Sequence, residues 1–216
     1  MTRFEPLFSY AKRSARHLDG RQLSCELCAA PVAEAHRHAV DLGDQRLLCI
    51  CHACALLFAS PDIATGRYRS VPDRIVADPA FSMSEEMWSS LEIPVRFAFV
   101  FHSSRRGRWI AMYPSPAGAT ESQLELGAWA PIVDASPLIA SVVPDVEALL
   151  VYGARAGEAL TCMVVPIDIC YELAAQVRRT WKGFSGGDAP TEIEASLQKL
   201  RERARPLVPE DPDDRH

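Results

Sequence analysis

Two pairs of cysteines have the spacing in this sequence that most clearly indicates chemistry. The pairs are Cys25 with Cys28, in CELC, and Cys51 with Cys54, in CHAC. A tight turn within such a pair points both sulfurs at one ion, and two such turns complete a tetrahedron of four thiolates. The 22 residues between Cys28 and Cys51 suffice for a strand, a turn and a returning strand. The sequence therefore predicts a metal site with four cysteine ligands.

Zinc is the metal expected in this site. Four thiolates around one Zn2+ leave no open position for a substrate or a water, so the site would hold the fold together and do no chemistry. Iron is the alternative, because the same four sulfurs bind a single iron in rubredoxins or a two-iron cluster. The glycine and proline that usually accompany rubredoxin cysteines are absent from CELCAAP and CHACALL, apart from Pro31, which favours zinc.

Four further side chains leave the ligand set open. Cys49 precedes Cys51 by two residues, a spacing that places both on one face of a strand, so Cys49 could replace Cys51. The favoured interpretation of Cys49 is nevertheless a buried strand cysteine. His36 and His38 are expected on the surface of the intervening loop, and His52 is expected to point to solvent. Any of these histidines could still complete a site with three cysteines.

Changes in pattern along the chain predict how this site is embedded. Prolines, a glycine and polar residues in SPDIATGRYRSVPDR separate a cysteine-rich module from a larger body. The predicted segments are a helical lead at 1–22, a zinc-ribbon-like metal module at 23–60, a connecting segment at 61–93, an α+β body at 94–204 and a disordered tail at 205–216.

The body is predicted to contain two β-hairpins followed by two helices. VRFAFVFH pairs with RWIAMY, and VEALLVYG pairs with the strand that ends at MVVP. The clearest helix is PIDICYELAAQVRRTWKGF, with Ile169, Leu173, Val177 and Trp181 at four-residue spacing, and PTEIEASLQKLRERA is the second. The fold class is α+β: a small rubredoxin-like zinc ribbon plus an antiparallel sheet covered by the C-terminal helices.

The loop YPSPAGATES is the strongest candidate for a catalytic segment. It contains Ser115, Thr120, Glu121 and Ser122, and loops rich in small hydroxyl residues can host catalysis. No G-x-S-x-G elbow and no paired base accompany them, so a rigid turn is the preferred interpretation. The protein is therefore predicted not to be an enzyme.

Composition and charge narrow the class of partner and the compartment. The formal net charge is -5, with Lys and Arg scattered, so no nucleic-acid partner is expected. No apolar run reaches the roughly 18 residues that span a bilayer, and charges occupy the start where a signal peptide is apolar. The protein is therefore predicted to be cytoplasmic. In that reducing compartment, metal ligation rather than disulfide bonds is expected to explain the clustered cysteines. The two isolated cysteines, Cys162 and Cys170, are expected to be buried.

Three stretches downstream of the cysteine pairs resemble a known family. They are AMYPSPAGATES, PDVEALLVYG followed by MVVPIDICYELAAQVRRTW, and WKGFSGG. The resemblance is to an uncharacterised bacterial family, a domain of unknown function often encoded in nickel-iron hydrogenase gene clusters. It covers nearly the whole chain and implies an accessory role, with a hydrogenase subunit or maturation factor as the protein partner. Nickel-delivery maturation factors have a similar ribbon but an N-terminal histidine, and here no histidine precedes His17.

Overall fold

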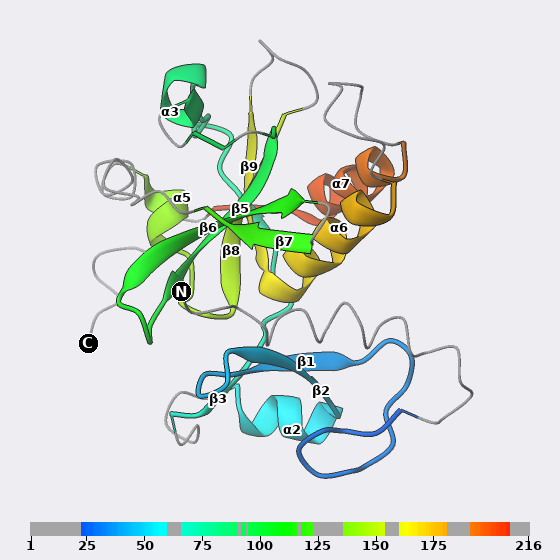
Figure 1. Cartoon of the computed structure of the whole chain (residues 1–216). Helices are drawn as coiled ribbons and strands as arrows, with labels where there is room; N and C mark the ends of the chain where they lie inside the picture. The colour runs from blue at the N-terminus through cyan, green and yellow to red at the C-terminus, as the bar shows by residue number, and fades with distance from the viewer. Residues whose placement is uncertain are drawn as a thin grey trace.

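The fold is known from a computed structural model of the whole chain (Figure 1). The residues that it describes are 23–59, 66–89, 92–93, 95–115, 118–122, 136–153, 160–180 and 191–207. The predicted helical lead at 1–22 lies outside them.

The described residues form two mainly antiparallel β-sheets with short and long helices packed on them, which confirms the predicted α+β class. The strands are β1 (Arg37–Asp41), β2 (Arg46–Ile50), β3 (Tyr68–Ser70), β4 (Val76–Ala77), β5 (Phe97–Ser103), β6 (Arg108–Ser115), β7 (Gly118–Glu121), β8 (Glu147–Tyr152), β9 (Thr161–Pro166) and β10 (Arg205–Pro206). The helices are α2 (His52–Leu57), α3 (Glu85–Ser89), α5 (Pro137–Ala140), α6 (Ile167–Thr180) and α7 (Thr191–Arg203).

The smaller sheet has the order β2-β1-β3 and, with α2, forms the metal module, which we call the ribbon (Figure 1). Strands β1 and β2 pair with His38 opposite Cys49 and Ala39 opposite Leu48. Their alternating side chains serve two cores. Leu48 and Ile50 pack with Cys25, Cys54 and α2, whereas Leu47 packs toward the larger body. The ribbon sheet is therefore buried on both faces.

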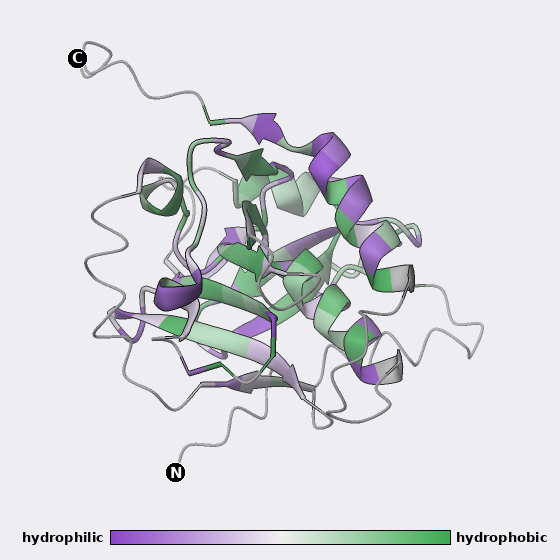
Figure 2. Ribbon diagram, turned by 90° about the horizontal axis from the view of Figure 1, so that it is seen from above, coloured by the Kyte–Doolittle hydropathy of each residue, from purple (hydrophilic) through white to green (hydrophobic). Residues whose placement is uncertain are grey.

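The larger sheet has the order β10-β4-β9-β8-β5-β6-β7 and contains both predicted hairpins, β5–β6 and β8–β9. Side chains alternate across it because successive strand residues point to opposite faces. Phe97, Phe99 and Phe101 face α6 and α7, whereas Ala98 and Val100 face α5 and Trp88 of α3. The apolar strands thus lie in the interior, while α7 is hydrophilic on its outer side (Figure 2).

Contacts of three kinds hold the ribbon on the body. Val40 of β1 and Leu47 of β2 join the apolar cluster under α6. Arg69 of β3 donates to the carbonyl oxygen of Pro144 at 2.9 Å. At the turn between β1 and β2, the carbonyl oxygen of Gly43 accepts a hydrogen bond from Arg105, at the tip of the β5–β6 hairpin. The ribbon and the body therefore share a packed interface.

The structure differs from the predicted segments at several short strands. The predicted tail begins too early, because Arg205–Pro206 form β10, which pairs in parallel with β4. The predicted connecting segment contributes β3 to the ribbon and β4 to the body. Two-residue strands carry no periodicity, so only tertiary pairing specifies β4 and β10. Among the described residues, no helix has the length and apolar character to cross a membrane.

Candidate metal centre

The first cysteine pair lies on a tight turn that precedes β1. The N–H of Ala29 donates to the carbonyl oxygen of Cys25 at 2.9 Å, and the N–H of Cys25 donates to the carbonyl oxygen of Ala30 at 2.7 Å. Ala29 has φ 62°, a left-handed conformation that usually favours glycine. An alanine therefore occupies a backbone position that glycine would adopt more easily. The tight turn itself is as predicted.

The second cysteine pair begins a helix. Cys51 is the N-cap of α2, with extended backbone, and its sulfur accepts from the N–H of Cys54 at 3.5 Å. The sequence predicted a second tight turn here, but the apolar residues of HACALL continue into a short helix that buries Cys54 and Ala55. The strand, turn and strand predicted between the pairs are β1 and β2, and they bring the two pairs together.

All four predicted cysteines meet at one point. The sulfurs of the four residues all lie within 4.8 Å of one another, so the group could hold a metal ion. The four are Cys25, Cys28, Cys51 and Cys54. The sulfurs of Cys28 and Cys51 are 3.6 Å apart. Four sulfurs at about 2.3 Å from one tetrahedral zinc are about 3.8 Å apart, so the spacing fits a metal bound at the centre. Cys25 and Cys54 are buried, and Cys28 is exposed.

The backbone around these sulfurs favours negative charge at Cys25. Burial raises the pKa of the Cys25 thiol, but backbone N–H groups of Cys51, Cys28 and Leu27 outweigh burial and lower it to about 6. Burial and the other three cysteines raise the pKa of Cys54. The Cys25 thiolate thus forms readily while Cys54 resists ionisation, and a cation among the four sulfurs would relieve the repulsion between them.

Cys49 is not close enough to the cluster to replace Cys51. It lies on β2 between Leu48 and Ile50, both of which face the cysteine cluster, so its own side chain points to the opposite face. Cys49 and Cys51 would share a face only if the strand continued through Cys51. Instead, β2 ends at Ile50 and α2 begins directly after Cys51. Cys49 is half-buried in the strand, whereas the favoured prediction is a buried strand cysteine.

The three histidines of the ribbon differ in their surroundings. His52 is exposed on α2, as predicted. The expected surface position is wrong for His38, which belongs to β1 and donates from Nδ1 to a carboxylate oxygen of Asp168 of α6 at 2.8 Å. Burial lowers the pKa of His38, but its hydrogen bonds to Asp168 and Cys49 outweigh burial and raise the pKa to about 9. His36 is half-buried beside it.

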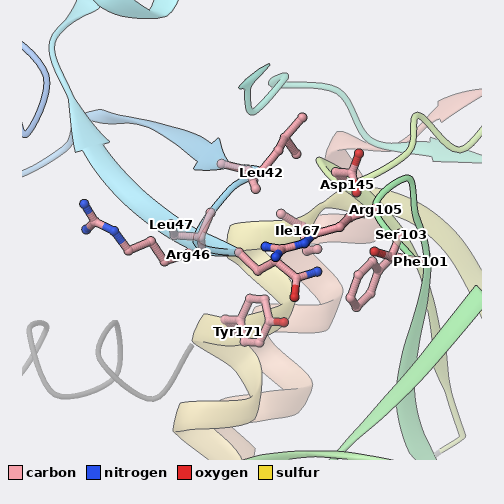
Figure 3. Close-up of a pocket in the computed structure, with 11 residues that line it drawn as sticks. Leu42, Arg46, Leu47, Phe101, Ser103, Arg105, Asp145, Ile167 and Tyr171 are labelled. Atoms are coloured by element: carbon pink, nitrogen blue, oxygen red, sulfur yellow. The ribbon is translucent and has the colours of Figure 1, made fainter. Parts of the chain in front are cut away.

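A small cavity lies where the ribbon meets the body (Figure 3). Its volume is about 30 Å³, enough for one or two waters. Tyr171 lines the cavity, and its hydroxyl is buried without a hydrogen-bond partner among the described residues. A water in the cavity would satisfy this hydroxyl. The lining comprises Val40, Leu42, Gln45, Arg46, Leu47, Phe101, Ser103, Arg105, Asp145, Ile167 and Tyr171.

The hydroxyl-rich segment after β6 forms a hairpin rather than an open loop. Ser115 of β6 and Thr120 of β7 hydrogen bond to each other at 2.7 Å. Glu121 accepts hydrogen bonds from Arg106 and Arg108, both at 2.9 Å. The hydroxyls of Ser115 and Thr120 are therefore engaged with each other, and the carboxylate of Glu121 is engaged by one arginine of β6 and one of the β5–β6 turn. The predicted strand RWIAMY ends at Tyr113, whereas β6 continues to Ser115 because β7 pairs alongside it there.

Comparison with protein families finds that residues 24–204 match DUF5947, a family of unknown function. The chain belongs to this family. The match covers the cysteine cluster and nearly all of the body. No curated protein and no solved structure matches the chain. The family supports the predicted resemblance to an uncharacterised family and adds no activity.

Proposed function

We propose that this DUF5947 protein is a non-enzymatic accessory protein in which zinc at Cys25, Cys28, Cys51 and Cys54 rigidifies a docking ribbon. The observation that supports the proposal most directly is the convergence of these four sulfurs within 4.8 Å. Four thiolates close a tetrahedral site, so the zinc would stabilise the module without binding substrate. The resemblance to a family encoded with nickel-iron hydrogenases suggests a hydrogenase subunit or maturation factor in the cytoplasm as the partner.

The docking surface that we propose is the outer side of α2. Leu56 is 62% exposed and Leu57 is 48% exposed, two and three residues after the ligand Cys54. Among the described residues, the third large exposed apolar side chain is Val143, in the body. Contiguous exposed apolar side chains mark candidate surfaces for binding another protein. The zinc site would hold this helix in place.

Zinc content tests the identity of the metal. We expect the purified, untagged protein to be colourless and to contain at least one zinc per chain that the Cys54→Ser variant lacks, as counted by plasma mass spectrometry. Iron in the same proportion, with a visible band that bleaches on reduction, would favour the alternative function, a rubredoxin-like electron-transfer protein. The exposed Cys28 favours that alternative, because an exposed ligand sulfur gives electrons a short path to a partner.

Exchanging both exposed leucines for glutamine tests the docking surface. Leu56→Gln with Leu57→Gln should leave the melting temperature nearly unchanged, because substitutions at exposed positions usually alter stability by less than about 0.5 kcal/mol. Recovery of the hydrogenase subunit or maturation factor by the tagged full chain from its host should fall at least about tenfold, the size of one lost hot spot.

The matched control is Val143→Gln, which removes an exposed apolar side chain from the body and should leave recovery unchanged. Equal recovery by the leucine variant and the unaltered chain would exclude α2 as the docking surface.

A further inference from the structure

Three side chains with metal-binding atoms meet on the body-facing side of the ribbon sheet, away from the four cysteines. They are His36, His38 and Cys49, with one ligand atom of each within 4.8 Å of the others. His38 and Cys49 are directly opposite each other on β1 and β2. The rings of His36 and His38 are in edge contact, with centroids 4.9 Å apart. We propose that these residues form a second metal site, with two imidazole nitrogens and one thiolate, that binds Zn2+ with one coordination position open.

The hydrogen bonds of His36 fix which of its nitrogens can bind a metal. Its Nδ1 lies 2.9 Å from the carbonyl oxygen of Glu34 and 3.0 Å from that of Ala33. Carbonyl oxygens only accept, so Nδ1 must carry the hydrogen, and the neutral ring then has its lone pair on Nε2. Within the described part of the chain, this Nε2 is buried and has no hydrogen-bond partner. A buried acceptor with no donor is costly, and a metal ion at that position would satisfy it.

His38 has the arrangement that protein zinc sites commonly use. Its Nδ1 lies 2.8 Å from a carboxylate oxygen of Asp168, in the first turn of α6, and its side chain also hydrogen bonds Cys49. Metal-binding histidines usually donate the nitrogen that does not bind the metal to a carboxylate, which orients the ring. Asp168 is therefore a positioning residue that directs the other nitrogen, Nε2, toward Cys49. It comes from the body, 130 residues away along the chain.

The ligand set identifies the class of metal. Imidazole and thiolate together suit zinc and its transition-metal neighbours and disfavour magnesium and calcium, which prefer oxygen ligands. Among the described residues the group has three members, one fewer than zinc takes in a closed structural site. Three protein ligands leave a fourth position for a water or a ligand from outside. This open site thus differs in kind from the closed four-cysteine site on the other face of the same sheet.

Equilibrium dialysis against Co2+ of the full chain loaded with a single zinc per chain tests the second site, because one equivalent of zinc fills the site with four thiolates first. Zinc binds thiolate sites more tightly than cobalt, so the four-cysteine site keeps its zinc and the added Co2+ reports the second site. We expect one cobalt per chain, with the absorption of a cobalt-thiolate bond. Cys49→Ser should abolish that absorption, and His36→Ala should weaken cobalt binding at least about tenfold, since each removes one of three ligands. Asp168→Asn should weaken it by about 10-fold to 100-fold while the absorption remains.

The matched control is His52→Ala, which removes an exposed histidine from the same ribbon and should change neither the cobalt count nor the spectrum. One zinc retained per chain in each variant shows that the ribbon is still folded, so a lost cobalt reports the site itself. The proposal is overturned if the unaltered chain takes up no thiolate-bound cobalt, or if the absorption survives Cys49→Ser. The test is independent of whether α2 binds a hydrogenase partner.

Discussion

Cys54→Ser is expected to remove the zinc from the four-cysteine site and to unfold the ribbon while the body sheet stays folded. Structural zinc contributes roughly 10 kcal/mol or more to folding in small zinc-binding peptides, far more than the ribbon's few apolar contacts with the body can replace. Cys54 is 8% exposed and belongs to the small core formed with Leu48 and Ile50. Hydrogen exchange should show the amides of β1 and β2 losing protection, and those of β5 and β8 keeping theirs.

The control for this experiment is Cys162→Ala, because Cys162 is a similarly buried cysteine that lies in the body, away from both clusters. It should keep its full zinc content and the protection of β1 and β2. A Cys54→Ser protein with normal zinc content and unchanged exchange would show that the four sulfurs do not hold the ribbon together.

Arg74→Ala is expected to lower the free energy of unfolding by about 3 kcal/mol, because it leaves a buried carboxylate without its cation. Glu147, at the start of β8, is 0% exposed, and both of its oxygens accept from Arg74, at 2.5 and 2.7 Å. Arg74 also donates to the carbonyl oxygen of Ser141 at 2.6 Å. Among the described residues, the N–H of Val143, 2.9 Å from one carboxylate oxygen, still donates to Glu147 when Arg74 is removed. Urea unfolding measures the loss.

Two further variants separate the buried charge from the general loss of an arginine. Arg203→Ala removes an arginine whose partner Asp73 is itself more than half exposed, and such surface pairs contribute about 0–1 kcal/mol. Adding Glu147→Gln to Arg74→Ala removes the unpaired charge and should restore part of the stability. Equal losses for Arg74→Ala and Arg203→Ala would contradict the assigned role of the buried pair.

The sequence predicts the four-cysteine cluster well because its signal is local. Each pair is held by its own turn or helix start, and β1 and β2 need only bring Cys28 near Cys51. The same holds for α6, where Ile169, Leu173 and Val177 pack as predicted against the body core. Trp181, the last member of that stripe, lies outside the described residues.

The second cluster was beyond sequence reasoning because its members are defined by long-range contacts. The spacing of His36 and His38 gives no sign of Asp168, which tertiary packing brings to His38. Strand alternation places Cys49 and Leu48 on different faces of the ribbon sheet. Both faces are buried, so the polarity of the residues does not indicate which face meets the body. The signal that could have been read is the β1–β2 pairing itself, which sets His38 opposite Cys49.

The two ends of the large sheet restrict how this protein can associate. In the described part of the chain, one edge is β10, two residues long and including Pro206, and the other is β7, four residues long. Long, unpaired edge strands recruit further strands, whereas very short edges and proline prevent it. Addition of a partner's strand and sheet-to-sheet aggregation are therefore both disfavoured. At this sheet, a partner is therefore expected to recognise the protein through side chains.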